Sequence, residues 1–240
     1  MPAPSFPGFP PEALTFFRQL KRNNNREWFE ARKSLFEQKV RGPMVALVEA
    51  LNTELATLAP DHVTEAKKAI YRLYRDTRFS KDKTPYKDHI AANFPHRKLD
   101  KHAGAGLYVG VSHESVDVAG GLYMPGPEQL LAVRNRLAER HAEFMALSGA
   151  RALRTLLGEL QGDQLTRVPK GFAADHPAAE LLRRKQWYWY VRLEPELATS
   201  PKLFAEVRKR VAAVLPAVAW LNTPLLTLEK KESDRARFAI

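Results

Sequence analysis

The sequence contains no cysteine among its 240 residues. This absence excludes disulfide bonds, cysteine-ligated zinc, iron–sulfur clusters and thiol nucleophiles. No apolar run approaches the roughly 18 residues that a membrane-spanning helix needs, and the N-terminus has neither the basic nor the apolar region of a secretory signal. We therefore expect a cytoplasmic protein with no export signal and no membrane segment.

Acidic residues are scarce relative to basic ones, since 27 Asp and Glu face 38 Lys and Arg and leave a net charge of +11. A surplus of this size favours polyanionic partners such as nucleic acid or phosphorylated metabolites. It is equally compatible with a charge that only keeps the protein soluble. With 45% hydrophobic residues, the chain can bury a sizeable core in one large domain or two small ones.

The order of the patterns predicts one α+β domain, in which a largely antiparallel sheet packs against several helices. Four prolines within residues 1–10 predict an extended N-terminal arm, because each proline removes a backbone donor and fixes φ. Residues 11–226 are expected to form the domain, and residues 227–240 a polar C-terminal tail.

Helical periodicity predicts a first helix from Pro11 and a second helix capped by Asn24, with Glu27 completing a capping box. A last long helix begins after Ser200, and Pro216 should break it because proline cannot donate the helical hydrogen bond.

Alternation of apolar and polar residues predicts the strands. Residues 107–118 alternate around a short polar turn, which is typical of a β-hairpin, and residues 186–194 give the strongest strand pattern. Residues 70–74 fit a short strand, which we favour, although they also fit one face of a helix. Three residues on the apolar faces are expected in the core: Trp28, Leu107 and Trp189.

The highest concentration of charge lies in residues 70–87, IYRLYRDTRFSKDKTPYK, which we call the basic segment. Its six cations and two acids give 6 − 2 = +4. The cations are Arg72, Arg75, Arg78, Lys81, Lys83 and Lys87, and the acids are Asp76 and Asp82.

Four stretches together resemble a bacterial and fungal family called domain of unknown function 2461. They are NNNREWF at 23–29, RDTRFSKDKTPYK at 75–87, GGLYMP at 120–125 and PKGFAADHP at 169–177. The resemblance covers roughly residues 6–225 and implies a single shared domain. The family name carries no activity, so the resemblance implies no catalytic residue.

The basic segment has three physical interpretations. Arginine forks, lysine charges and backbone donors can together bind a phosphate or carboxylate. Alternatively, the arginines pair with acids in a structural network that ties helices to the sheet, or the charges are simply solvated. For the first interpretation the expected ligand-binding residues are Arg72, Arg75, Arg78, Ser80, Lys81, Lys83, Tyr86 and Lys87.

A rival hypothesis is an enzyme that holds an anionic substrate with the same cations. Its candidate proton-transfer groups are Asp76, Asp82, Tyr86, His89 and the pair Asp175–His176. Structural pairing and capping explain the carboxylates equally well, so the catalytic residues stay unknown. We expect no cofactor, because neither Gly120–Gly121 nor Lys170–Gly171 has the spacing of a nucleotide fingerprint.

A metal site is not expected either. His89, His96 and His102 share one stretch of sequence but lack the spacing of a helical zinc motif.

The aromatic run at Trp187, Tyr188, Trp189 and Tyr190 admits two interpretations. Exposed rings beside basic residues stack on single-stranded nucleic acid. A core strand with tryptophans inward and tyrosines at its margin explains the same run, and we favour that structure.

Overall fold

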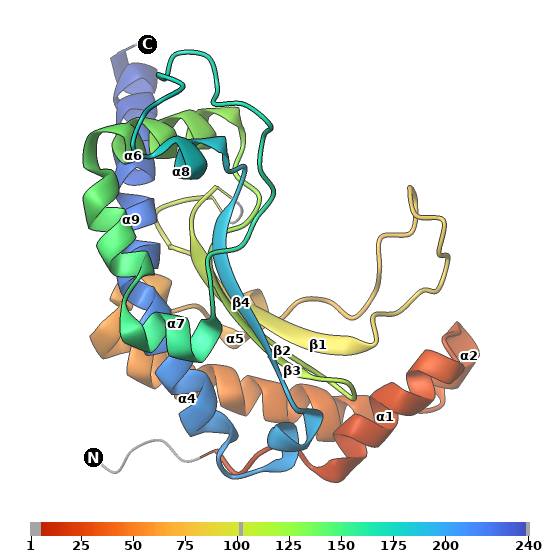
Figure 1. Cartoon of the computed structure of the whole chain (residues 1–240). Coiled ribbons are helices and arrows are strands. Elements are labelled where there is room, and N and C mark those ends of the chain that lie inside the picture. Colours follow the sequence, from red (N-terminus) through yellow and green to blue (C-terminus); the bar gives the residue numbers. More distant parts are fainter. Residues whose placement is uncertain (1–5, 101–102, 239–240) are drawn as a thin grey trace. The chain divides into compact units, whose positions relative to one another are not determined.

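The computed structural model describes residues 6–100 and 103–238, with side chains described up to Lys230. The fold class is α+β, as predicted, with an antiparallel sheet of four strands in the order β1-β2-β3-β4 (Figure 1). The strands are β1 (His89–Phe94), β2 (Gly106–Ser112), β3 (Val116–Leu122) and β4 (Trp187–Leu193).

Helices make up most of the remaining regular structure. The N-terminal helices are α1 (Pro11–Arg22), α2 (Arg26–Glu30), α3 (Lys33–Phe36), a π-helical turn (Glu37–Arg41), α4 (Gly42–Leu58), a 3₁₀ turn (Pro60–His62) and α5 (Ala66–Ala69). The later helices are α6 (Pro127–Ser148), α7 (Arg151–Leu157), α8 (Ala179–Arg183), a 3₁₀ turn (Pro195–Thr199) and α9 (Leu203–Phe238).

The chain forms two compact units, each built from separate stretches of sequence. The first unit contains the chain up to Phe94, Tyr108–Val118 and Arg192–Lys209. The second contains Pro95–Leu107, Ala119–Val191 and the chain from Arg210 onward. Strands β2, β3 and β4 and helix α9 each run from one unit into the other, so neither unit is a continuous piece of chain.

The core of the first unit is rich in aromatic rings. Helix α1 buries Phe16 and Phe17. The centroid of the Phe16 ring lies 6.4 Å from that of Phe29 and 5.6 Å from that of Phe36. The predicted N-terminal arm docks on this unit: Phe9 is buried, and its N–H donates to the Ala198 carbonyl at 2.7 Å. Residues 1–5 of that arm lie outside the described residues.

The core of the second unit contains both tryptophans of β4. Trp187 and Trp189 are fully buried, and the ring of Phe144 in α6 lies 6.1 Å by centroid from that of Trp189. Helix α9 packs directly on β3, since a Cβ added at Gly120 would lie 2.5 Å from Cγ1 of Val214. The glycines in the GGLYMP stretch therefore serve close packing.

The predictions for the cap of α2 and for residues 70–74 are wrong. Helix α2 is capped by Asn25, whose side chain accepts from the Trp28 N–H at 2.9 Å, and Asn24 has a different role described below. Residues 70–74 form no regular strand, and isolated bridges join Ile70 to Ala92 and Tyr74 to Tyr86.

Helix α9 continues through Pro216, contrary to the predicted break. A proline inside a helix costs about 3 kcal/mol. Burial of Val214, Val218 and Leu221 around it offsets that cost, because each buried apolar side chain contributes about 1.5–3 kcal/mol. The predicted polar tail at residues 227–238 is the C-terminal part of the same helix.

Helix α9 is also long and apolar enough to cross a membrane, judged by length and composition over Leu203–Lys230. Half of its most apolar window, 50%, is buried inside the protein, and a core helix of a soluble protein has the same character. This is weak evidence for a membrane span, and the expected absence of a membrane segment stays a prediction.

Trp28 is only half-buried, whereas Leu107 and Trp189 are core residues as predicted. The Arg32 guanidinium lies 4.5 Å from the centroid of the Trp28 ring and covers its outer face. We expect Trp189→Ala to lower the free energy of unfolding by about 3–5 kcal/mol because it leaves a cavity. Trp28→Ala should cost only about 1–2 kcal/mol.

Urea unfolding followed by circular dichroism measures both changes, with Met124→Ala as an exposed control. A Trp189→Ala protein with an unchanged unfolding midpoint would contradict the placement of this strand.

Candidate functional site

The basic segment belongs to the first unit, where it leaves α5, forms a projecting loop and returns to β1 (Figure 1). The two sides of the loop pair irregularly through their backbones. The Arg75 N–H donates to the Pro85 carbonyl at 2.8 Å, and the Lys87 N–H donates to the Leu73 carbonyl at 2.9 Å. These bonds fix the base of the loop, so residues 76–84 project from a defined position.

Asn24 fastens the C-terminal side of this base. Its side-chain amide donates to the Tyr86 carbonyl at 2.9 Å, and its side-chain oxygen accepts from the Tyr86 N–H at 3.0 Å. The tyrosine ring is buried, with its centroid 4.4 Å from that of Phe29 and 5.0 Å from that of Tyr74. Burial raises the pKa of Tyr86 to about 12.

Tyr86 is buried, so the structure gives no support to its prediction as a ligand-binding residue. Its side chain is only 1% exposed, because the ring anchors the loop in the aromatic core of the first unit.

Two arginines of the segment pair with its own acids. Arg78 forms a bidentate pair with Asp76, with Nε to Oδ1 at 3.0 Å and Nη2 to Oδ2 at 2.8 Å. Arg75 pairs with Asp82 and also donates to the Thr84 hydroxyl. The hydrogen bond from Arg75 lowers the pKa of Asp82 to about 2, so this carboxyl is ionised at neutral pH.

Both pairs join residues of the same loop, so they shape the loop and do not tie helices to the sheet. The side chains of Arg78 and Asp76 are 77% and 43% exposed. Exposed pairs of this kind contribute little to stability, because water and salt screen both charges. The structural-network interpretation correctly paired the two arginines with Asp76 and Asp82. These pairs stay within the loop and do not link it to the helices or the sheet.

Backbone contacts hold the tip of the loop. The Lys83 ammonium donates to the Thr77 carbonyl at 2.9 Å, and the Ser80 N–H donates to the same carbonyl at 3.3 Å. On the return side, the Thr84 N–H and hydroxyl both donate to Oδ1 of Asp82, at 3.0 and 2.9 Å. The tip is thus closed by its own hydrogen bonds.

The remaining predicted contact residues differ in exposure. Arg72 and Lys81 are exposed to solvent, and Ser80 is half-buried. Lys87 is also half-buried, and its ammonium lies 5.1 Å from the centroid of the Tyr71 ring.

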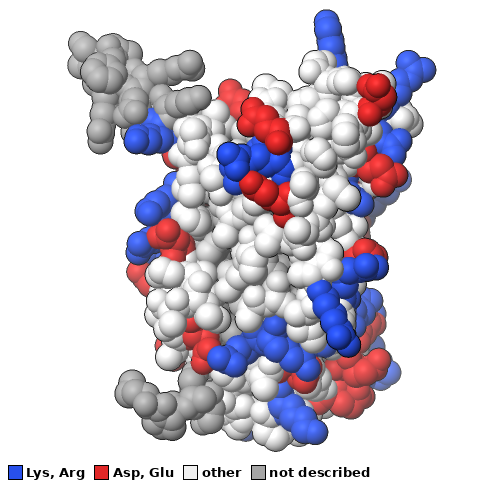
Figure 2. Space-filling model, turned by 60° about the vertical axis from the view of Figure 1, so that its left-hand side comes forward, with Lys and Arg blue, Asp and Glu red and all other residues white. Residues whose placement is uncertain are grey.

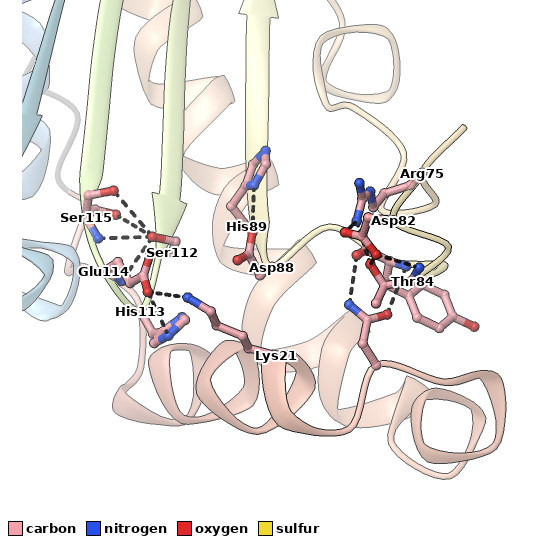
Figure 3. Close-up of polar contacts among 12 residues, drawn as sticks. Lys21, Arg75, Asp82, Thr84, Asp88, His89, Ser112, His113, Glu114 and Ser115 are labelled. Carbon is pink, nitrogen blue, oxygen red and sulfur yellow. Dashed lines mark hydrogen bonds and ion pairs between the residues drawn. The ribbon is translucent and has the colours of Figure 1, made fainter. Parts of the chain in front are cut away.

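A second group of charged side chains in the first unit was not predicted (Figure 3). Lys21 projects from α1 and pairs with Glu114 in the turn between β2 and β3. His113 in the same turn has its Nε2 3.7 Å from Oε1 of Glu114, and burial lowers its pKa. The individual residues gave no sequence signal, because a Ser-His-Glu-Ser turn is ordinary hairpin composition.

His89 lies beside this group at the start of β1. Its Nδ1 lies 3.3 Å from Oδ1 of Asp88, and this hydrogen bond lowers the pKa of Asp88. The pair follows Lys87 directly in sequence, so it adjoins the end of the basic segment.

The other predicted histidine sites have structural contacts. His176 accepts from the Ala178 N–H at 2.9 Å through Nδ1, and its ring lies 5.6 Å from that of His141, while Asp175 is exposed. His96 is buried, and His102 lies outside the described residues. Among the residues that are described, no group of three or more His, Cys, Asp or Glu side chains is placed to hold a metal ion.

The charge of the protein is dispersed over the face shown in Figure 2. Basic and acidic side chains are interspersed there, and wide areas carry no charge. This face offers no continuous basic stripe.

Comparison with known proteins identifies a family. Residues 12–220 match a family model described as a conserved hypothetical protein, DUF2461. Neither the curated proteins nor the solved structures gave a match.

Removing the amide of Asn24 should loosen the basic segment without unfolding the protein. Asn24→Ala leaves the N–H and carbonyl of Tyr86 without these partners, at a cost of about 1–3 kcal/mol. We expect trypsin to cleave within residues 72–87 about 5- to 100-fold faster, because local opening limits proteolysis.

The matched control is Asn25→Ala, which loses a helix cap at a cost of about 1 kcal/mol and should leave cleavage within the segment unchanged. Mass spectrometry of the fragments locates the cuts. Equal cleavage in both variants would show that Asn24 does not hold the segment.

Proposed function

Since the chain belongs to the DUF2461 family of conserved hypothetical proteins, a name that carries no activity, we propose a function from its own residues. The protein binds a phosphate-bearing or other anionic ligand, nucleic acid included, through the basic segment.

The observation that carries this proposal is a net charge of +4 on a loop whose base is fixed. The hydrogen bonds from Asn24 and the burial of Tyr86 hold that base. Preorganised cations lose less conformational entropy when they bind a ligand than cations on a flexible chain.

The arginine pairs do not prevent binding. Because the Arg78–Asp76 pair is exposed, its small net stability allows a phosphate to replace the carboxylate as the partner of the guanidinium. The planar fork of donors suits phosphate as well as it suits carboxylate. Arg72 and Lys81 add exposed positive charge on the same segment.

Binding should depend strongly on salt. If the site neutralises about five phosphates, the logarithm of the association constant for a mixed-sequence oligonucleotide should fall with the logarithm of salt concentration at a slope of about −4. Arg72→Glu with Lys81→Glu should weaken this binding by at least tenfold and reduce the slope by about 1–2.

The matched control is Arg167→Glu with Lys170→Glu, two exposed cations outside the segment. Each double variant changes the charge by −4, so both carry 11 − 4 = +7. Fluorescence anisotropy measures the affinities. Equal losses in the two variants would contradict a localised site, and salt-independent binding would contradict the proposal as a whole.

A second candidate is an enzyme that hydrolyses a phosphate ester, and the Asp88–His89 pair favours it. A carboxylate on Nδ1 orients an imidazole for proton transfer. In this reaction His89 takes a proton from water, the water oxygen attacks phosphorus, and the ester oxygen leaves with a proton from solvent.

Hydrolysis of bis(4-nitrophenyl) phosphate tests this candidate. His89→Gln should abolish hydrolysis by the wild-type protein while oligonucleotide affinity changes less than about twofold, because the histidine is outside the binding loop. A wild-type protein that releases no nitrophenolate, or a fully active variant, removes the candidate.

A further inference from the structure

The tip of the basic segment carries a phenylalanine in an unusual environment. Phe79 is 94% exposed, more than any other large hydrophobic side chain among the described residues. It takes no part in holding the loop, which depends on Tyr86 and on the contacts of Thr77 and Thr84. A ring with this exposure is accessible to a binding partner.

The loop presents this ring in a defined place. Phe79 lies between Thr77 and Ser80, whose backbone groups close the turn with a hydrogen bond of 3.3 Å. The Lys83 ammonium holds the carbonyl of Thr77 from the other side of the loop at 2.9 Å. The ring therefore projects from a turn that its own hydrogen bonds maintain.

Cations flank Phe79 on both sides in the sequence. The Arg78 guanidinium carbon lies 5.8 Å from the centroid of the Phe79 ring, and Asp76 holds that guanidinium with two hydrogen bonds. Lys81 follows two positions later and is exposed. An aromatic face between two positive charges matches a nucleobase between two phosphates of a single strand.

We propose that the anionic ligand of the basic segment is single-stranded nucleic acid, with a base stacked on Phe79 and adjacent phosphates bound by Arg78 and Lys81. This inference rests on the proposed function and names its ligand. Stacking on a ring requires a base whose face is free, as in a single strand, whereas duplex bases already stack on one another. Recognition by stacking is tolerant of sequence because every base has an aromatic face.

An anionic membrane surface is the competing partner, because phenylalanine also inserts between lipid headgroups. Surface-binding elements usually present a continuous apolar face on a helix. The loop offers one apolar ring among charged and polar residues. A single strand therefore fits the loop better.

The test measures binding of the full chain to four probes. They are an oligothymidylate of about 15 nucleotides, a duplex of the same length, heparin, and vesicles of phosphatidylcholine with phosphatidylserine. The variants are Phe79→Ala, Phe79→Tyr, which keeps a ring, and Met124→Ala as an exposed control outside the segment.

We expect the wild-type protein to prefer the oligothymidylate over the duplex. Phe79→Ala should weaken oligothymidylate binding by about 5- to 100-fold. Phe79→Tyr and Met124→Ala should stay within about twofold of the wild-type affinity. Heparin has no bases, so its affinity should be unchanged in Phe79→Ala.

Each other outcome has a definite meaning. If Phe79→Ala binds the oligothymidylate normally, the stacking inference is overturned, while salt-dependent binding to heparin still supports the proposed function. Equal losses for oligothymidylate and heparin would also overturn stacking. Loss of vesicle binding alone would identify a membrane surface, and failure of the wild-type protein to bind any of the four probes would overturn the proposed function itself.

Discussion

One side-chain amide holds the candidate site in place. The Asn24 side chain donates to the Tyr86 carbonyl and accepts from the Tyr86 N–H, as the backbone of a neighbouring strand would. The Tyr86 ring is buried at the same point against Phe29 and Tyr74, so backbone and side chain are both held there. The projecting loop and the start of β1 both depend on this attachment.

Two of the four family stretches meet through this contact. NNNREWF supplies Asn24 and the Phe29 ring, and RDTRFSKDKTPYK supplies Tyr86. The first stretch therefore serves as the support of the second. GGLYMP serves packing within the second unit, since a Cβ at Gly121 would lie 2.3 Å from the Trp187 carbonyl oxygen at a φ of +135°. A stretch shared with a family thus need not touch a ligand to be required by the fold.

Charge within the basic segment is divided between shaping the loop and facing solvent. The side chains of Asp76 and Asp82 each accept a hydrogen bond from the backbone N–H two residues later. Each also pairs with an arginine of the same loop. The pairing rigidifies the loop but leaves the net +4 unchanged, because pairs within a segment cannot alter its total charge. The exposed ring of Phe79 then adds an apolar contact at the place where this positive charge is concentrated.

The sequence by itself determined what local chemistry decides. Alternating residues predicted the hairpin of β2 and β3 and the inward tryptophans of β4, and Pro11 correctly marked the start of α1. The composition also located the most basic segment and its possible internal partners. Such features depend on residues a few positions apart, so periodicity and turn chemistry specify them.

Tertiary structure decided the features that depend on distant partners. The capping-box spacing favoured Asn24 over Asn25 as the helix cap, and the bonds of Asn24 to Tyr86, 62 positions away, leave the cap to Asn25. Residues 70–74 form no regular strand, because they pair with the opposite stretch only at two isolated bridges, to Tyr86 and Ala92. Pro216 stays within a helix because buried neighbours outweigh one missing hydrogen bond. Burial and long-range pairing contribute more free energy than local propensity at these positions, and no local pattern in the sequence records them.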